Sequence, residues 1–159
     1  MGEFITSSNV FVDQTEKSRI NVLRAISKRA EELGITDDAE AVFQAFLWRE
    51  NQCETGMEDG FAVPHAKSAA IKYASVIVFK TKKALEWPSF DGKPVDISIA
   101  LLVPEAEAGT THLKLLSKTA ILLMEPDFRD FVRNSNDVGA IAKRVDDGVS
   151  SIEDDEDDD

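Results

Sequence analysis

Short apolar segments with the composition of β-strands recur along this chain. Residues 10–12 and 75–80 are rich in β-branched and aromatic residues, and residues 97–103 form an almost unbroken apolar run. This pattern predicts three strands, the last of them a central strand that is covered on both faces. A shorter strand is predicted over residues 61–65, stopped by Pro64 because proline cannot donate to a ladder of hydrogen bonds.

Between these strands, apolar residues recur at the spacing of an amphipathic helix. The first helix is expected over about residues 15–33, with Gly34 as its stop signal. The second is expected to run to about residue 52 and to begin at a capping-box pattern of Asp37 and Glu40. Three more helices are predicted over residues 112–124, from Pro126 through Phe131, and over residues 137–145.

The alternation of strands and helices predicts an α/β fold, a mixed β-sheet flanked by helices on both faces. The chain has 159 residues, of which 43% are hydrophobic, so it fits one domain, predicted over residues 1–145. Residues 146–159 carry nine acidic residues and no basic one, which predicts a disordered acidic tail. A solubilising end is the ordinary interpretation of such a tail, and an interaction segment is the alternative.

Composition excludes several functional classes. The net charge of −12 lacks the basic footprint of a general nucleic-acid binder. The single cysteine, Cys53, excludes an internal disulfide and is expected to be a partly buried small hydrophobe. With only two histidines beside it, we predict neither a metal site nor a cofactor. No apolar run approaches the length of a membrane span and no signal peptide is visible, so we predict a cytoplasmic protein without membrane insertion.

Four polar residues occupy positions that favour chemistry: His65, His112, Arg49 and Glu50. His65 follows Pro64 at a strand end, where α/β folds expose functional groups. His112 opens a helix after the central strand, and helix N-termini hold phosphate and other anions. Arg49 and Glu50 come together at the end of the second helix, with Glu50 in line with its apolar stripe. A guanidinium binds phosphate oxygens through paired donors.

These parts favour phosphoryl transfer by a histidine nucleophile, because neutral imidazole is nucleophilic near physiological pH and the phosphoryl group mainly needs positioning. Each residue also has an ordinary interpretation. His65 can be a surface or hydrogen-bonded residue, and His112 a packed residue at a helix start. Arg49 can be a solvated charge that pairs with Glu50 or Glu54. The sequence has no P-loop and no dinucleotide fingerprint.

The surroundings of these residues form two motif blocks. The first block is Arg49-Glu50, Glu54-Thr55-Gly56 and Gly60-Phe61-Ala62-Val63-Pro64-His65-Ala66-Lys67. The second is Trp87-Pro88-Ser89-Phe90-Asp91-Gly92-Lys93-Pro94-Val95, Val103-Pro104-Glu105 and His112-Leu113-Lys114-Leu115-Leu116-Ser117-Lys118. Together they resemble the fructose/mannitol-type enzyme IIA domain of the bacterial phosphoenolpyruvate-dependent sugar phosphotransferase system, closer to the fructose branch. The likeness covers about residues 10–145.

The resemblance implies that His65 accepts a phosphoryl group from the histidine-containing phosphocarrier protein and passes it to a cysteine of enzyme IIB. It implies that His112 lies beside His65 and helps to hold the phosphate, with Arg49 also at the site. We expect Glu50 to orient the site loop by accepting hydrogen bonds from its backbone. Association with a membrane enzyme IIC complex would follow from these partners. The chain departs from many relatives at residues 57–59, where Met-Glu-Asp replaces Ile-Gly-Asn and places two carboxylates near the expected site.

Two functions of different classes fit this resemblance. The first is a transport phosphocarrier that serves uptake of a fructose-like sugar, favoured by the Asp-Gly-Lys-Pro-Val block at residues 91–95. The second is a regulatory interaction protein of the nitrogen-related enzyme IIA type, which signals through the phosphorylation state of His65. In either case partners must reach His65, and we expect Trp48, Met57 and Phe61 at the rim of an exposed patch.

Overall fold

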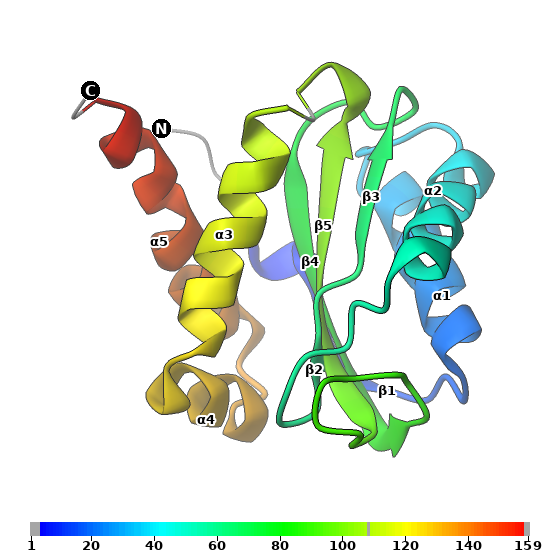
Figure 1. Cartoon of the computed structure of the whole chain (residues 1–159), viewed down its shortest axis with the longest axis vertical. Helices are drawn as coiled ribbons and strands as arrows, with labels where there is room; N and C mark the ends of the chain where they lie inside the picture. The colour runs from blue at the N-terminus through cyan, green and yellow to red at the C-terminus, as the bar shows by residue number, and fades with distance from the viewer. Residues whose placement is uncertain (1–3, 108, 158–159) are drawn as a thin grey trace.

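The computed structural model describes residues 4–107 and 109–157, with side chains as far as Ser150 (Figure 1). In this part of the chain a five-stranded sheet lies between helices. The strands are β1 (Val10–Gln14), β2 (Phe61–Ala62), β3 (His65–Ser68), β4 (Ser75–Leu85) and β5 (Val95–Pro104). The helices are α1 (Arg19–Glu32), α2 (Ala39–Gln52), α3 (Thr111–Leu123), α4 (Pro126–Asn134) and α5 (Val138–Asp157), with short 3-10 turns η1 (Ser7–Asn9) and η2 (Glu105–Glu107).

The sheet is mixed, as the sequence predicted. Its order is β1-β4-β5-β2, and β3 pairs with β5 as well. β1 is parallel to β4, β4 is antiparallel to β5, and both β2 and β3 are parallel to β5. The predicted central strand is therefore β5, which has a paired neighbour along each edge.

Helices cover both faces of this sheet, α1 and α2 on one and α3, α4 and α5 on the other (Figure 1). The alternation of side chains along the central strands divides the core accordingly. On β4, Val76 and Val78 pack on the side of α3 to α5, whereas Ile77 and Phe79 pack on the side of α1 and α2. Burial on both faces explains why the central strands are almost continuously apolar.

Two helices begin later than their sequence pattern predicted, because their caps decide the start. The Ser18 hydroxyl accepts a hydrogen bond from the Asn21 N–H at 3.1 Å, so α1 begins at Arg19 and not near residue 15. The cap of α2 is Asp38 and not Asp37, since the Asp38 carboxylate accepts from the Ala41 N–H at 3.1 Å.

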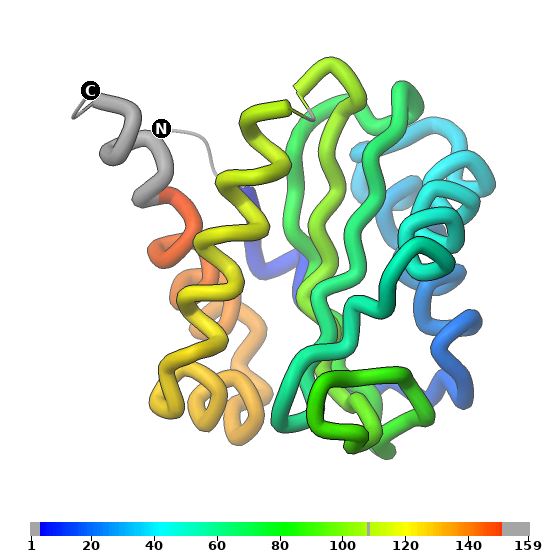
Figure 2. The backbone as a smooth tube through the Cα atoms, in the orientation of Figure 1, coloured from blue at the N-terminus to red at the C-terminus, as the bar shows by residue number. Residues whose placement is uncertain are grey.

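The strand expected to stop at Pro64 in fact resumes at His65. Pro64 has no N–H to donate, but its carbonyl accepts a hydrogen bond from the Leu101 N–H at 2.9 Å, so the segment stays on the sheet edge. Residues 61–68 consequently follow the edge of β5 as two short strands (Figure 2). This places His65 at the beginning of a strand and not in a loop after one.

Helix α5 continues past residue 145, where the sequence predicted the domain to end, as far as Asp157. Val145 and Val149, one turn apart, are both buried, and a Cβ on Gly148 would lie 2.5 Å from a methyl group of Leu122. The Asp146 carboxylate accepts a hydrogen bond from the Phe4 N–H at 3.0 Å. The acidic composition concealed an apolar stripe that continues at helical spacing. The last two residues of the predicted tail, 158 and 159, lie outside the described residues.

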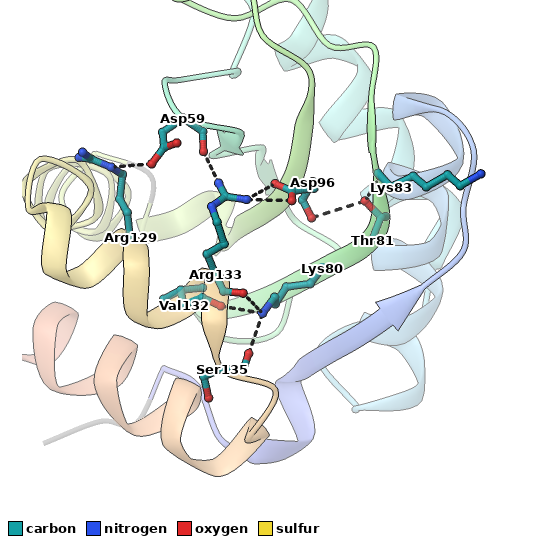
Figure 3. A network of polar contacts seen from close by, with 9 residues as sticks. All are labelled: Asp59, Lys80, Thr81, Lys83, Asp96, Arg129, Val132, Arg133 and Ser135. Carbon is teal, nitrogen blue, oxygen red and sulfur yellow. Dashed lines mark hydrogen bonds and ion pairs between the residues drawn. The ribbon is translucent and has the colours of Figure 1, made fainter.

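A network of polar contacts fastens α4 to the sheet (Figure 3). The buried Lys80 ammonium group donates to the carbonyls of Val132, Arg133 and Ser135 at 2.6, 3.2 and 2.7 Å, so β4 supplies the cap for the end of α4. Nη1 of Arg133 in turn donates to both oxygens of the Asp96 carboxylate, at 2.9 and 2.8 Å. These contacts fix α4 relative to β4 and β5.

Candidate active site

The two histidines lie side by side, as the resemblance implied. His65 opens β3 on the face opposite to Ala66, and its side chain is 4% exposed. His112 is in the first turn of α3 and is also buried. The two ring centroids are 5.0 Å apart and the rings are inclined at 46°. His65 is therefore the buried first residue of a strand and not an exposed residue at the end of one, as its sequence position had indicated.

A backbone contact determines which nitrogen of His65 is available. The Nδ1 atom lies 2.8 Å from the Val63 carbonyl oxygen. A carbonyl only accepts, so Nδ1 carries the ring proton in this contact and Nε2 keeps its lone pair. The nucleophilic atom of a neutral His65 is then Nε2.

The electrostatic environment keeps both rings neutral at physiological pH. Burial lowers the pKa of His65 from 6.5 to about 4; the nearby charges of Arg49, His112 and Lys67 add to this, and the Val63 hydrogen bond opposes it. Burial also lowers the pKa of His112, again assisted by Lys67 and Arg49. A neutral imidazole is the form that a nucleophilic role requires.

A small cavity of about 130 Å³ opens beside His65 and is lined by Ala45, Trp48, Arg49, His65 and Lys67. Arg49 and Lys67 give this cavity a positive charge, which suits an anion. The guanidinium of Arg49 donates to the Cys53 carbonyl and so is held at the end of α2. Lys67 was not assigned a role from the sequence, although its position two residues after His65 on a strand places both on one face.

Glu50 is buried, as its place in the apolar stripe predicted, but its hydrogen-bond donors differ from the expected backbone groups. Its carboxylate accepts from the Thr55 hydroxyl and from the Arg19 guanidinium, the latter at 3.3 Å. Burial raises the pKa of Glu50, and the Thr55 hydrogen bond and the charges of Arg19 and Arg49 oppose that rise. The Thr55 carbonyl accepts from the Val63 N–H at 2.9 Å, which connects this cluster to the residue that holds His65.

The two motif blocks of the sequence meet at the Thr-Gly turn. Gly56 forms bridges to Ala62 and to Ser89, and a Cβ on Gly56 would lie 2.2 Å from the Pro88 carbonyl oxygen. Only glycine allows the loop before β2 to approach the loop after Trp87 so closely. This contact explains why a glycine in one block accompanies a proline-containing turn in the other.

The carboxylates of Glu58 and Asp59 disturb the candidate site less than their position in the sequence indicated. Asp59 has a φ of 59°, a conformation that aspartate tolerates better than most residues. Its carboxylate accepts from Arg129 of α4 at 3.1 Å, and its carbonyl accepts from Arg133 (Figure 3). Glu58 is exposed. The negative charge of Asp59 is therefore paired with Arg129 of α4.

Two expectations about exposure are wrong. Phe61 is fully buried, because alternation along β2 points it into the core, and it cannot form the rim of a docking patch. Cys53 is exposed, since it caps the end of α2 and lies outside its apolar stripe. Trp48 is 61% exposed at the cavity beside His65, and Met57 is partly buried against the core.

A larger cleft, of about 780 Å³, does not include His65. It is lined by Arg19 together with the carboxylates Glu54 and Glu86 and the aromatic residues Trp87 and Phe90. Charges of both signs make it a poor match for a phosphoryl group, so its size does not make it the reacting site. Among residues 4–107 and 109–157, no group of three or more His, Cys, Asp or Glu is placed to hold a metal ion. Within the same residues, no helix has the length and apolar character to cross a membrane.

Comparison with known proteins identifies the family. The family model described as "Phosphoenolpyruvate-dependent sugar phosphotransferase system, EIIA 2" matches residues 3–147. The chain belongs to this family, which confirms the resemblance carried by the two motif blocks.

The curated relatives include both transport and regulatory proteins. The chain is 31% identical over 131 residues to the 2-O-alpha-mannosyl-D-glycerate-specific EIIABC component of Escherichia coli, and 30% identical over 127 residues to the fructose-specific EIIABC component of Bacillus subtilis. These matches cover 82% and 80% of this chain but only 20% of each relative. It is 34% identical over 124 residues to the nitrogen regulatory protein of Bradyrhizobium diazoefficiens, covering 78% of this chain and 80% of that protein.

Solved structures show the same fold. The nitrogen regulatory protein IIA-Ntr of Neisseria meningitidis matches with a TM-score of 0.83 and 26% identity, over 90% of this chain and 97% of that one. The mannitol enzyme IIA in a complex with phosphorylated enzyme IIB from Escherichia coli matches with a TM-score of 0.62 and 14% identity, over 91% and 93% of the two chains. The predicted mixed sheet between helices is thereby confirmed.

Proposed function

We propose that this chain is a phosphohistidine carrier, in which His65 accepts a phosphoryl group from the histidine-containing phosphocarrier protein and passes it to a cysteine of enzyme IIB. One observation carries the proposal: Nδ1 of His65 is committed to the Val63 carbonyl, so Nε2 is free in a ring that lines a cationic cavity. The lowered pKa of His65 supports it, because the nucleophile is then neutral at physiological pH.

The proposed reaction has two steps, each a displacement at phosphorus. In the first, the Nε2 lone pair of His65 attacks the phosphorus of the donor's phosphohistidine. The new N–P bond forms as the bond from phosphorus to the donor nitrogen breaks, and that nitrogen keeps the electron pair. In the second step an enzyme IIB thiolate attacks the phosphorus, an S–P bond forms and Nε2 recovers its lone pair. The ring proton stays on Nδ1 throughout, hydrogen-bonded to the Val63 carbonyl, so Nε2 has no proton to lose.

Other residues of the site have supporting roles in this proposal. Arg49 binds the phosphoryl oxygens and stabilises their negative charge, and Lys67, on the same cavity, adds to that charge. His112 holds the phosphoryl group from the other side, because its ring lies against that of His65. Glu50 orients the loop before His65 through Thr55.

Exposed apolar side chains near the site are the proposed docking surface for both partners. Trp48 borders the cavity beside His65, α3 carries the exposed Leu113 next to His112, and the exposed Met124 follows the end of α3. Met124 and the exposed Phe90 border a groove of about 280 Å³. A modest apolar surface suits a carrier, since each partner must leave after one transfer.

Transport of a fructose-like sugar is the use that we propose first. It is supported by the Asp-Gly-Lys-Pro-Val block at residues 91–95 and by the similarity to the fructose-specific relative. In that use the chain works in the cytoplasm and serves a membrane enzyme IIC complex. Signalling of the nitrogen-related type is the second candidate, favoured by similarity to nitrogen regulatory proteins over most of their length.

The experiment that tests the carrier function is phosphorylation in a purified system. The protein is incubated with phosphoenolpyruvate, its upstream kinase and the phosphocarrier protein, and the phosphorylated residue is located by mass spectrometry. We expect an acid-labile, base-stable phosphoryl group on His65 that is absent from His65→Asn. Phosphorylation that persists in His65→Asn would refute the assignment.

Adding a purified enzyme IIB then separates the two candidate uses. Transport predicts that the phosphoryl group moves from His65 to the enzyme IIB cysteine and that the carrier returns to its unmodified mass. Regulation predicts that the label stays on His65. Loss to water without an enzyme IIB product would contradict both uses.

A further inference from the structure

Arg19 is a residue that no motif includes and that the fold brings to the back of the candidate site. It is the first residue of α1, and its guanidinium lies 3.3 Å from the Glu50 carboxylate at the end of α2. The Glu50 side chain is 3% exposed and that of Arg19 is 28% exposed. One carboxylate oxygen accepts from Arg19 and the other from the Thr55 hydroxyl, so each oxygen has its own donor.

The charge of Glu50 decides the direction of its bond to Thr55. As a carboxylate, Glu50 only accepts, and the Thr55 hydroxyl must donate to it. If Glu50 is protonated, it carries a donor of its own and no longer requires the hydroxyl in that orientation. Burial favours the protonated form and raises the pKa of Glu50. The Thr55 hydrogen bond and the charges of Arg19 and Arg49 oppose that rise and favour the ionised form.

The groups that face Glu50 come from four parts of the chain. They are Arg19 of α1, Arg49 of α2, Thr55 of the loop after α2, and Trp87 of the loop after β4. The Arg49 guanidinium is bonded to the Cys53 carbonyl and also lines the His65 cavity, where it faces the reacting group. Arg19 is the cation within hydrogen-bond distance of the carboxylate.

A continuous set of contacts leads from this cluster to the nucleophile. The Thr55 backbone carbonyl accepts from the Val63 N–H at 2.9 Å, and the Val63 carbonyl lies 2.8 Å from Nδ1 of His65. Thr55 is thus held by its side chain at Glu50 and holds Val63 by its backbone. A displaced Thr55 would move the carbonyl that keeps the ring proton on Nδ1.

We propose that Arg19 is a positioning residue of the phosphoryl-transfer site. By keeping Glu50 as an anion, Arg19 fixes the Thr55 hydroxyl, and through Thr55 and Val63 it holds His65 with Nε2 as the free nitrogen. This inference rests on the proposed phosphocarrier function. It assigns part of the site to α1, which is far in sequence from both motif blocks.

The test compares Arg19→Gln with Arg19→Lys and with Arg24→Gln. Arg24 is the matched control, because it lies on the same helix and pairs at 3.5 Å with the exposed Glu40. The rate of phosphoryl acceptance is measured from pH 6 to pH 8.5, and the His65 tautomer is read from ring ¹⁵N shifts by NMR.

We expect Arg19→Gln to accept phosphate more slowly than the wild type, most of all at the acid end of this range and by up to about tenfold, since the loss of one close cation changes a pKa by about one unit. The loss should diminish as the pH rises, since a higher pH favours the ionised form of Glu50. Arg19→Lys should restore most of the rate, and Arg24→Gln should match the wild type. The tautomer with the proton on Nδ1 should lose population only in Arg19→Gln.

Glu50→Gln supplies a second, independent comparison. If Arg19 acts through the charge of Glu50, Arg19→Gln should add little to Glu50→Gln in the double variant. The proposal is overturned if Arg19→Gln keeps both the wild-type pH profile and the wild-type tautomer, or if the two substitutions act additively. If the wild type is not phosphorylated at all, the carrier function fails, while the tautomer measurement still decides the role of Arg19.

Discussion

Acid should destabilise this protein through His65 in a window that the structure defines. Burial lowers the pKa of the folded-state imidazole to about 4, whereas the unfolded chain has the ordinary value of 6.5. Between these two values the unfolded state binds a proton that the folded state does not. Stability is therefore complete above about pH 6.5 and is lost as the pH falls toward about 4.

The size of the effect follows from the same two values. One pKa unit corresponds to about 1.4 kcal/mol, so the largest loss from His65 is about 3 kcal/mol. At pH 5, where the unfolded state is almost fully protonated and the folded state almost fully neutral, the loss is about 2 kcal/mol. This is a substantial part of the total free energy of unfolding of an ordinary domain.

The assay is urea denaturation at pH 7.5 and pH 5.0 for the wild type and for His65→Asn. Asparagine cannot titrate in this range, and its amide can donate to the Val63 carbonyl in place of Nδ1. Titrating groups that do not contact His65 are present in both proteins and cancel in the comparison. We expect the wild type to lose about 2 kcal/mol more than His65→Asn between the two pH values.

A direct measurement accompanies this comparison. An NMR titration of the His65 ring should give a midpoint well below that of an exposed histidine. If the two proteins lose the same free energy within about 0.5 kcal/mol, burial does not lower the pKa of His65, and the argument for a permanently neutral nucleophile fails.

Three further predictions concern the site and the end of the chain. His112→Ala should still accept a phosphoryl group on His65 but pass it to enzyme IIB at least several-fold more slowly; a wild-type transfer rate would reduce His112 to a packing residue. Lys67→Gln should slow the acceptance of a phosphoryl group by His65 about threefold to tenfold. The difference in rate from the wild type should shrink at high salt, because it arises from a charge, whereas a loss that does not depend on salt would indicate a structural role. Truncation after residue 152 should leave stability and phosphotransfer unchanged. Truncation after Val145 removes the buried Val149 and should lower the free energy of unfolding by about 2 kcal/mol or more in urea denaturation. Equal stability of the two truncated proteins would show that α5 ends near Val145.

The sequence by itself determined those features that depend on local periodicity and on single residue types. The continuous apolar run of β5 could only be a strand buried on both faces, and the helical stripes of α1 to α4 located those helices to within a few residues. The glycine and proline positions of the two motif blocks indicated where the chain turns. These blocks also indicated that His65 and His112 belong to one site, and the fold brings their ring centroids to 5.0 Å from each other.

Burial and partner choice were decided only by the tertiary structure. Residues 146–150 belong to the domain because α3 and the N-terminal segment pack against them. Amino-acid composition does not predict such tertiary neighbours. Phe61 is buried because its side chain faces the core, and Cys53 is exposed because its side chain faces solvent. A short strand and a helix end have too few residues for their periodicity to predict which way these side chains point.

The detailed chemistry of the site also came from the fold. No pattern in the sequence joins Arg19 to Glu50, because the contact exists only when α1 packs beside α2. Nor does a Pro-His pair specify which ring nitrogen is free; that is set by the distance from Nδ1 to the Val63 carbonyl. Local sequence determines which elements form, whereas hydrogen-bond partners and pKa values depend on groups that come together only when those elements pack.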